Sequence, residues 1–427
     1  MVLPKKTVKN NSQSAFFSQS DLPVTQVLPR LTAALNDPGR AVLQAPPGSG
    51  KTTRVPLALL NAPWLAGKKI LMLEPRRLAA RTCARFMAAQ CREKAGQTVG
   101  YRVRMETRVS AGTRIEVLTE AILTRMIQTD PALEGVGLVI FDEFHERHIH
   151  SDLGLALCLE TAEVLRPDLR ILVMSATMDT RSLGFLLDPV KIIVSKGRQW
   201  PVDTVYLPPP PGRSGPGPFG AVLTGCVTAV LTALDHHAGD ILVFLPGAAE
   251  IRHMARILGE KTGPGVQVFA LSGRLSPDRQ QAALAPSPQG RRKVVLATAI
   301  AETSLTIEGV TVVVDSGLMR RPLFFPGTGL TRLQTLPVSR ASADQRRGRA
   351  GRIGPGICYR IWSEHVHKGL VRFSRPEILE QDLAGVALEL ALWGVRDAKD
   401  LKWLDPPPAP AFARARDLLH RLGCLDD

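Results

Sequence analysis

A short segment with two glycines, a lysine and a threonine limits the possible folds of this chain more than any other feature. It spans residues 45–52, after the apolar run 41–43 and before the apolar-rich stretch 55–60. Between a strand and a helix, such a turn points backbone N–H groups and a helix N-terminus at phosphate oxygens. The pattern G-x-x-x-x-G-K-[ST] is met except at its first glycine, where this chain has Ala45. A phosphate-binding loop is favoured over a chance glycine-rich turn, and its predicted binding residues are Gly48, Ser49, Gly50, Lys51, Thr52 and Thr53.

Two adjacent carboxylates follow a second apolar run. Residues 137–141 read as a buried parallel strand, and Asp142 and Glu143 come directly after them. The carboxyl ends of parallel strands are where α/β sheets bind ligands. We expect Lys51 to reach the β and γ phosphates of a nucleotide, and Thr52 with Asp142 to hold Mg²⁺. Glu143 is then placed to accept a proton from an attacking water. The alternative for the pair is a solvated acidic turn.

The histidines that follow these carboxylates could be mistaken for a zinc site. A zincin helix has its histidines at positions i and i+4, whereas His145 and His148 are three residues apart and His150 lies on another face. We therefore interpret His145 as a coupling residue beneath the nucleotide site.

Composition favours an acidic partner and a reducing compartment. The chain of 427 residues has 54 basic and 39 acidic residues, so its formal charge is 54 − 39 = +15, which favours binding to a polyanion. Its six cysteines include no C-x-x-C pair, which favours reduced thiols in the cytoplasm. No signal peptide and no apolar run of membrane-spanning length is found, so no membrane partner is expected.

Strand-like and helical stretches alternate through two successive parts of the chain. The clearest strands are predicted at 70–73, 136–141 and 171–174, then at 241–245, 266–270, 294–296 and 310–314. This alternation predicts α/β units with parallel sheets. The proline-rich stretch 207–218 reads as a surface loop, and helices are expected at 379–393 and 411–422. The predicted divisions are a flexible tail 1–21, α/β units 22–197 and 198–372, and a helical region 373–427.

Blocks after further strands complete a recognisable set. Residues 175–177 and 298–305 each follow a strand, and Gln345, Arg349 and Arg352 belong to a glycine- and arginine-rich block at 345–352. Arg349 and Arg352 are three residues apart, so on a helix they would share a face. Two arginines on one face can neutralise charge on a transferring phosphoryl group. We prefer this interpretation to a solvated basic helix.

From about residue 22 onward, the order and spacing of these blocks resemble the DEAH-box RNA helicases of superfamily 2, and among them the bacterial HrpB-type enzymes. The resemblance implies two tandem RecA-like domains that bind ATP, or another NTP, with Mg²⁺ at their interface. It also implies single-stranded RNA as partner, a monomer, and a small winged-helix-like region at the end, possibly truncated. The family's ratchet and oligonucleotide-binding modules are absent from the sequence, so we expect a fragment or a natural truncation.

The family's roles fall on particular residues of this chain. Glu143, Asp142, Lys51, Gln345, Arg349 and Arg352 are the implied catalytic residues, and Ser175 and Thr177 join His145 as coupling residues. The block 298–305 supplies Glu302, Thr303 and Ser304, and residues 319–332 correspond to a strand-separating β-hairpin. Nucleic-acid contacts are implied for Pro75, Arg76, Arg77, Thr119, Glu120 and Thr298.

Three positions depart from the family pattern. Phe144 replaces a non-catalytic alanine, and Ala299 replaces a common asparagine. Leu284 stands near the position of a base-stacking phenylalanine, so we expect weak base stacking and broad use of ATP, GTP, CTP and UTP.

Three other functions were weighed against a helicase. The first is an NTPase that is stimulated by nucleic acid and remodels ribonucleoproteins without processive unwinding. The second is an inactive RNA-binding scaffold, which the intact Lys51, Glu143 and arginines oppose. The third is a P-loop kinase, which would leave the second α/β unit without a role.

Overall fold

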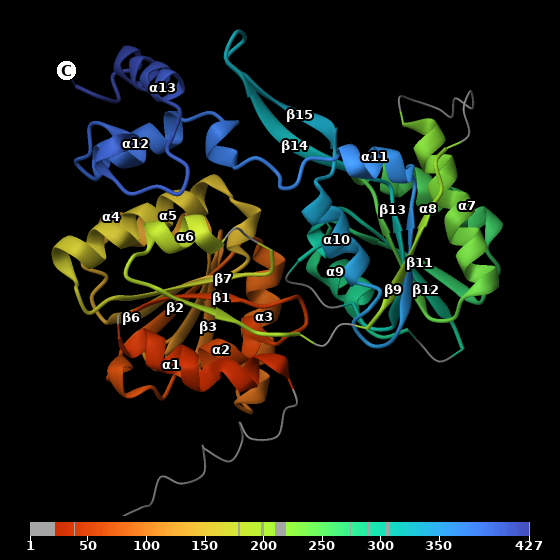
Figure 1. Ribbon diagram of the computed structural model, residues 1–427, viewed down its shortest axis with the longest axis horizontal. Helices are drawn as coiled ribbons and strands as arrows, with labels where there is room; N and C mark the ends of the chain where they lie inside the picture. Colours follow the sequence, from red (N-terminus) through yellow and green to blue (C-terminus); the bar gives the residue numbers. More distant parts are fainter. Residues whose placement is uncertain are drawn as a thin grey trace, which may run out of the picture.

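The apolar runs of the sequence become the central strands of two separate parallel sheets. The computed structural model describes residues 22–37, 39–177, 180–197, 200–209, 219–273, 275–287, 290–303 and 307–426. Two α/β units lie next to each other, and the C-terminal helices sit over the first of them (Figure 1). The predicted tail 1–21, most of the proline-rich loop and Ser304 lie outside the described residues.

The first unit is built on an eight-stranded sheet with the order β4-β3-β5-β2-β6-β7-β1-β8. Every residue of β6 is buried, which explains why its sequence is continuously apolar. All neighbouring strands are parallel except β3 and β4. The strands are β1 (Arg40–Gln44), β2 (Lys69–Glu74), β3 (Val99–Val103), β4 (Glu106–Arg108), β5 (Ile115–Thr119), β6 (Val136–Phe141), β7 (Arg170–Ser175) and β8 (Lys191–Val194). The helices are α1 (Leu28–Asn36), α2 (Lys51–Leu59), α3 (Arg77–Gln90), α4 (Glu120–Thr129), α5 (Ile149–Glu160) and α6 (Thr180–Leu186).

The second unit is built on a six-stranded sheet that is parallel throughout, with the order β11-β12-β10-β13-β16-β9. Its strands are β9 (Val202–Tyr206), β10 (Asp240–Phe244), β11 (Val266–Leu271), β12 (Arg292–Ala297), β13 (Val310–Asp315) and β16 (Gly356–Arg360). Its helices are α7 (Gly220–His236), α8 (Ala248–Lys261), α9 (Pro277–Leu284), α10 (Arg340–Gly348) and α11 (Glu364–Gly369). The predicted class, two successive parallel α/β units, is confirmed.

A two-stranded antiparallel hairpin projects from the second unit (Figure 1). It consists of β14 (Leu318–Phe325) and β15 (Leu330–Pro337), so the hairpin expected at 319–332 is present and slightly longer. Its outer leucines Leu330 and Leu333 are 54% and 64% exposed. The hairpin also contacts the C-terminal region, because Arg321 Nη1 lies 3.2 Å from Glu380 Oε2 and the Phe324 N–H donates to the Glu380 carbonyl.

The C-terminal region packs against the first unit and shares its apolar core. Its regular elements are the single turns η7 (Glu377–Leu379) and η8 (Ala398–Asp400) and the helices α12 (Ala384–Leu392) and α13 (Ala409–Arg421). Side chains of α12 and α13, such as Leu390 and Leu419, belong to the same buried cluster as Leu123 of α4. The prediction of a single helix at 379–393 is wrong for its first turn, because α12 begins only at Ala384. Asp382 Oδ1 accepts a hydrogen bond from the Ala384 N–H, which turns the chain before α12 begins.

No helix among the described residues is both long and apolar enough to cross a membrane.

Candidate nucleotide and nucleic-acid site

The segment 45–52, with its two glycines, lysine and threonine, forms a tight turn between β1 and the start of α2. Gly48 and Gly50 have φ of 80° and 90°, a left-handed conformation that glycine adopts without steric cost. A Cβ on Gly50 would also lie 2.9 Å from Leu22 Cδ1. The loop and the start of α2 bury the Ser49 and Lys51 side chains, and the Ser49 hydroxyl has no hydrogen-bond partner among the described residues. A phosphate group fits such a loop, which offers backbone N–H groups, a lysine and an unused hydroxyl.

The carboxylates after β6 lie directly against this loop. Thr52 Oγ1 donates to Asp142 Oδ2 at 2.5 Å, and Lys51 Nζ donates to Glu143 Oε1 at 3.0 Å. The hydroxyl and carboxylate oxygens of Thr52 and Asp142 are hard ligands of the kind that Mg²⁺ selects. Glu143 has φ of 50°, a left-handed conformation that is costly for a residue with a side chain and that recurs at functional sites.

Burial separates the pKa values of the two carboxylates. Burial raises the pKa of Asp142 to about 6, with Lys51 opposing this and the charge of Glu143 adding to it. Burial also acts to raise the pKa of Glu143, but Lys51 and His145 outweigh it and hold that pKa at about 2. Glu143 therefore stays ionised near neutral pH, as a proton acceptor must.

Three residues of the second unit face this loop from α10 and the turn that follows it. Gln345 Nε2 donates to Thr177 Oγ1 at 2.9 Å, which bridges the two units. Arg349 is buried and donates through Nε to the Glu302 carbonyl at 2.8 Å, and its positive charge helps to lower the pKa of Glu143. Burial lowers the pKa of Arg352 to about 10, and the nearby charge of Glu143 opposes this. The structure thus brings all six predicted catalytic residues to one interface.

The prediction that Arg349 and Arg352 share a helical face is wrong. Helix α10 ends at Gly348, and both arginines lie beyond its end. Gly351 contributes to the end of the helix, because the chain there packs closely against Trp200. A Cβ at Gly351 would lie 2.7 Å from the Trp200 carbonyl oxygen. The Trp200 N–H donates to the Gly351 carbonyl, so the segment between the two units holds the turn in place.

The predicted coupling residues connect the surroundings of the phosphate loop with α10 of the second unit. Ser175 ends β7 and is fully buried beside the phosphate loop, where its carbonyl accepts from the Ala45 N–H. His145 Nδ1 lies 3.5 Å from both Glu143 Oε2 and the Ala176 nitrogen. Burial lowers the pKa of His145, so the ring is neutral near pH 7. His145 thus contacts both the carboxylate pair and the segment that holds Thr177.

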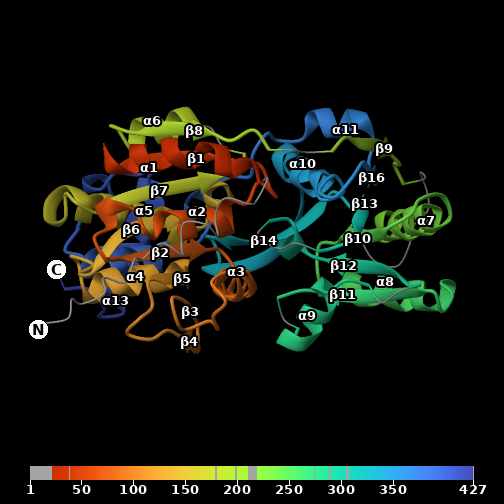
Figure 2. The same ribbon diagram turned by 90° about the horizontal axis from the view of Figure 1, so that it is seen from below.

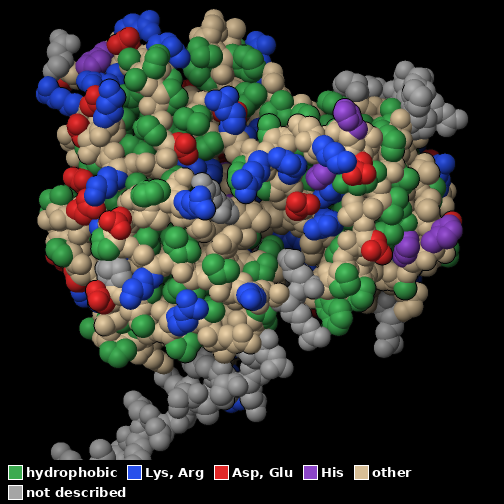
Figure 3. All heavy atoms as spheres, in the orientation of Figure 1, with side chains coloured by type: hydrophobic (Ala, Val, Ile, Leu, Met, Phe, Trp, Pro, Cys, Tyr) green, Lys and Arg blue, Asp and Glu red, His purple; other side chains and the backbone are tan. Residues whose placement is uncertain are grey.

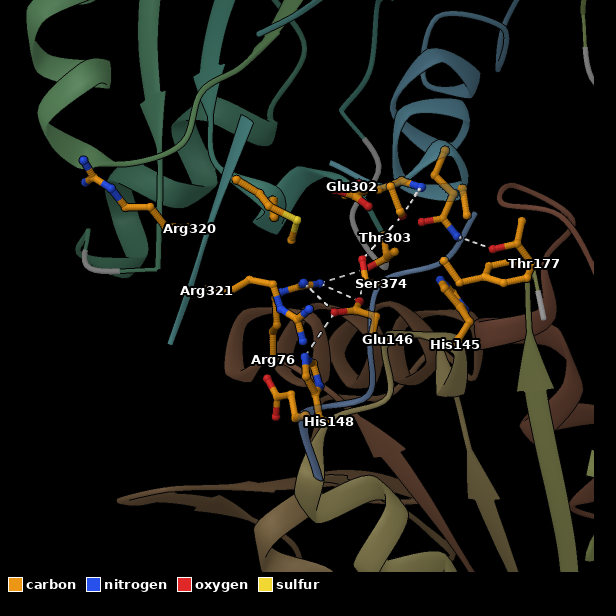
Figure 4. Close-up of a pocket in the computed structure, with 18 of the residues that line it drawn as sticks. Arg76, His145, Glu146, His148, Thr177, Glu302, Thr303, Arg320, Arg321 and Ser374 are labelled. Carbon is orange, nitrogen blue, oxygen red and sulfur yellow. Dashed lines mark hydrogen bonds and ion pairs between the residues drawn. The ribbon is translucent and has the colours of Figure 1, made fainter. Parts of the chain in front are cut away.

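Arg76 occupies a different environment from the one expected of a phosphate contact. Its guanidinium forms a two-pronged ion pair with Glu146 at 2.8 and 2.6 Å and donates to Thr303 Oγ1 of the second unit at 2.7 Å (Figure 4). Glu146 also accepts a hydrogen bond from the Thr303 hydroxyl. In this conformation Arg76 therefore joins the two units and offers no unpaired charge.

The other predicted nucleic-acid residues lie around an interdomain cleft of ≈ 770 Å³. Its lining includes Arg76, Arg77 and Thr298, together with Gln280 of α9 and Arg320 of the hairpin. Arg77 is exposed at the start of α3. Thr119 is outside the cleft lining but pairs in register with Glu74, so it ends a strand at the same edge of the sheet. Figure 3 shows Lys and Arg side chains along the line where the two units meet.

Two residues of this interface were missed by sequence reasoning. Arg346 is fully buried, with Nε 3.0 Å from Glu302 Oε2 and Nη1 2.8 Å from Asp315 Oδ1, and its guanidinium lies over the Phe244 ring. Glu146 pairs with Arg76. Both residues are adjacent in sequence to predicted site residues, which was the only sign of their importance. What each one does becomes clear only from a partner that is distant in the sequence.

Leu284 is not placed as its sequence position suggested. Its side chain is only 7% exposed and packs in the apolar core of the second unit with Leu271 and Ala297. It therefore presents no open face on which a base could stack in this conformation.

The histidines around the carboxylates take part in ion pairs. His148 Nδ1 lies 3.3 Å from Glu120 Oε1 and its Nε2 lies 3.4 Å from Glu146 Oε2. Across the described ranges, no cluster of three or more His, Cys, Asp or Glu side chains suits a metal ion. All six cysteines are free thiols.

Replacement of His148 by glutamine should lower stability in a pH-dependent way. Burial acts to lower the pKa of His148, but Glu120, Glu146 and Glu377 outweigh it and raise the pKa to about 9. A folded-state pKa above the ordinary value of about 6.5 stabilises the fold fully below pH ~6.5. That contribution is lost as the pH rises through about 9. The difference in Tm between wild type and H148Q should therefore be largest near pH 6.5 and shrink toward pH 9, and a difference that is constant with pH would contradict this.

Comparison with known proteins identifies the class that this fold and site define. Residues 26–184 match the family described as DEAD/DEAH box helicase, and residues 225–354 match the helicase conserved C-terminal domain. Together these ranges cover more than half of the chain, and the chain belongs to the DEAD/DEAH-box helicases. Its two α/β units are the tandem RecA-like domains of that family.

Individual relatives point to one branch of the family. The chain is 48% identical over 409 residues to the ATP-dependent RNA helicase HrpB of Escherichia coli (strain K12), which covers 95% of this chain and 49% of that protein. The crystal structure of Escherichia coli DEAH/RHA helicase HrpB superposes with a TM-score of 0.89 at 47% identity, covering 95% of this chain and 51% of that one. That of E. coli DExH-box NTPase HrpB gives 0.85 at 46% identity, covering 96% and 50%. The chain thus spans about half the length of these relatives.

Proposed function

We propose that this chain is an NTP-dependent helicase or translocase that acts on nucleic acid, with ATP as its nucleotide and single-stranded RNA as its main partner. The observation that carries this proposal is the buried meeting of Lys51 and Glu143 from one RecA-like domain with Arg349 from the other. A site divided between two domains can link nucleotide turnover to their relative movement. The family membership and the chain's similarity to an ATP-dependent RNA helicase support the same conclusion.

The chemistry assigned to the residues is mainly positioning and electrostatic stabilisation. Glu143, ionised and next to Lys51, accepts the proton of the attacking water, and Gln345 orients that water. Lys51, Arg349 and Arg352 place positive charge around the transferring group. Mg²⁺ held by Thr52 and Asp142 would supply further charge neutralisation when bound. Because Lys51 pairs with Glu143 in this conformation, nucleotide phosphates must compete for the lysine.

Coupling to movement follows from the contacts that cross the interface. Thr177 accepts from Gln345, and Thr303 accepts from Arg76. Both pairs join a segment near the nucleotide carboxylates to a segment of the second domain. A change of nucleotide state that separates the domains must break them, so the two sites are linked through common residues.

Nucleic acid is assigned to the 770 Å³ cleft near Arg77 and Thr298. The arginines and polar side chains within its mixed lining suit contacts with the sugar-phosphate backbone, which fix the position of a strand without reading its sequence. The family resemblance also leads us to propose a monomer that acts on single-stranded RNA with Mg²⁺ as its metal. The six free thiols support a location in the reducing cytoplasm.

The hairpin favours strand separation over remodelling without unwinding. Apolar wedges separate stacked bases at a cost of about a few kcal/mol per step, and Leu330 and Leu333 are exposed on the hairpin. L330D/L333D should slow strand displacement on the order of tenfold, which corresponds to about 1.4 kcal/mol. RNA-stimulated NTP hydrolysis should change little, because the substitutions are distant from Lys51 and Glu143 in the fold.

Strand displacement and hydrolysis measured in parallel test this prediction. The control is L392D/L422D, which alters two leucines of comparable exposure in the C-terminal region. Wild-type protein that hydrolyses ATP with RNA but displaces no strand would favour the remodelling NTPase. A hairpin variant that displaces strands at the wild-type rate would remove the hairpin from that role.

A further inference from the structure

A row of arginines on α3 leads out of the interdomain cleft and has no part in the proposed reaction. Arg77, Arg81 and Arg85 are spaced four residues apart, so they lie along one side of the helix. Arg77 and Arg81 line the cleft of ≈ 770 Å³. Arg85 lines a separate cavity of ≈ 380 Å³ together with Lys94 and Arg108, which we call the edge cavity. The row therefore connects the two hollows.

Figure 2 shows how this connection runs through the fold. Helix α3 lies on the side of the first domain that faces the second, across from α9, and β3 and β4 lie next to it at the edge of the sheet. Eight residues separate Arg77 from Arg85, a distance of about 12 Å along the helix axis. A strand that leaves the cleft over α3 would reach the edge cavity within a few nucleotides.

Neighbouring carboxylates neutralise the edge cavity only in part. Glu106 accepts from Tyr101 Oη at 2.5 Å and from Arg81 at 3.3 Å, and Glu93 accepts from the Thr98 N–H and hydroxyl at 2.8 and 3.0 Å. The charge of Glu106 is thus shared with Arg81, whereas Glu93 bonds only neutral groups and lines the edge cavity with its charge. Arg85, Lys94 and Arg108 are exposed. Arg85 has a hydrogen bond to Tyr101 and acts on Glu106 through its charge.

Three exposed cations line the edge cavity with one carboxylate, that of Glu93, so the cavity keeps a net positive charge that suits a polyanion. We propose that Arg85, Lys94 and Arg108 are a second nucleic-acid subsite, which binds phosphates of a single strand that continues from the cleft along α3. This inference rests on the proposed function, because it requires the strand to occupy the cleft. Because the contacts are with phosphates, the subsite should increase the affinity for longer strands whatever their sequence.

Binding of an oligouridylate length series, measured by fluorescence anisotropy, tests the subsite. The variant R85A/K94A/R108A should bind the longest strands on the order of 100-fold more weakly at about 0.1 M salt, because each lost single-strand contact removes about 0.7 from the salt slope. Its affinity for strands that fill only the cleft should match wild type. The variant R85K/R108K keeps the charges and should retain long-strand affinity.

The matched control is R252A/K261A/R291A, which removes two arginines and a lysine that are exposed on the second domain. It should bind every length as wild type does. The inference is overturned if R85A/K94A/R108A equals this control at all lengths, or if it weakens short and long strands alike. If RNA still stimulates ATP hydrolysis in that case, the proposed function survives and only the subsite fails. Wild-type protein that binds no strand at all would overturn both.

Discussion

Replacement of Glu143 by glutamine should nearly abolish ATP turnover while ATP still binds. The amide keeps the shape of the side chain but cannot accept a proton at neutral pH. Loss of a general base typically lowers the rate by about 10²–10⁴. The Lys51–Glu143 ion pair also weakens in this variant, so the lysine is freer to meet phosphate and ATP affinity should stay the same or rise. Steady-state turnover and equilibrium binding of a fluorescent ATP analogue measure the two effects separately.

A control for this prediction is Glu134→Gln, which makes the same chemical change at an exposed position of the first domain. It should leave both turnover and affinity unchanged. Near-normal turnover in E143Q would remove Glu143 from the role of proton acceptor. Loss of ATP binding together with turnover would instead assign Glu143 a part in holding the nucleotide.

Replacement of Arg349 by alanine should lower turnover even further. An arginine that stabilises the transferring phosphoryl group can supply about 10³–10⁵ in rate. Burial, and then the charge of Arg352, lowers the pKa of Arg349 well below its usual range. Burying the charged Arg349 next to Arg352 costs folding free energy. Removal of Arg349 should therefore harm stability much less than catalysis. Turnover and Tm measured on the same preparation separate the two.

The matched control is Arg347→Ala, two positions earlier in the last turn of α10, because the Arg347 side chain is 43% exposed and lies 4.0 Å from Asp344. Exposed ion pairs of this kind contribute little to stability, and this one is distant from the carboxylates. R347A should therefore keep most of the activity. If R349A and R347A lose activity to the same small extent, the assignment of Arg349 to the reaction is incorrect.

The sequence predicted the parts of this site that depend on local patterns. The phosphate loop and the strand that ends just before Asp142 each have a signature within a few residues, and the structure has them where expected. The hairpin was expected from the family resemblance and is also present. Buried parallel strands can also be predicted from the sequence, because a strand covered on both faces is apolar throughout.

The errors arose where distant contacts decide the outcome. Helix α10 ends at Gly348, because the chain around Gly351 packs against Trp200, which lies 151 positions earlier in the sequence. Arg76 reads as a free phosphate contact until Glu146 and Thr303 are seen to hold it. Leu284 reads as a possible base contact until its burial in the core of the second domain is known. A local sequence pattern cannot predict contacts with residues that are so distant in the sequence.

The central claim is that the two domains together form an ATPase that responds to nucleic acid. The most direct test is the steady-state ATPase rate of this chain with single-stranded RNA, with single-stranded DNA and with neither, in wild type and in R349A. We expect RNA to increase the wild-type rate, and the R349A rate to stay low in all three conditions. A wild-type rate that no nucleic acid changes, or one that persists in R349A, would contradict it.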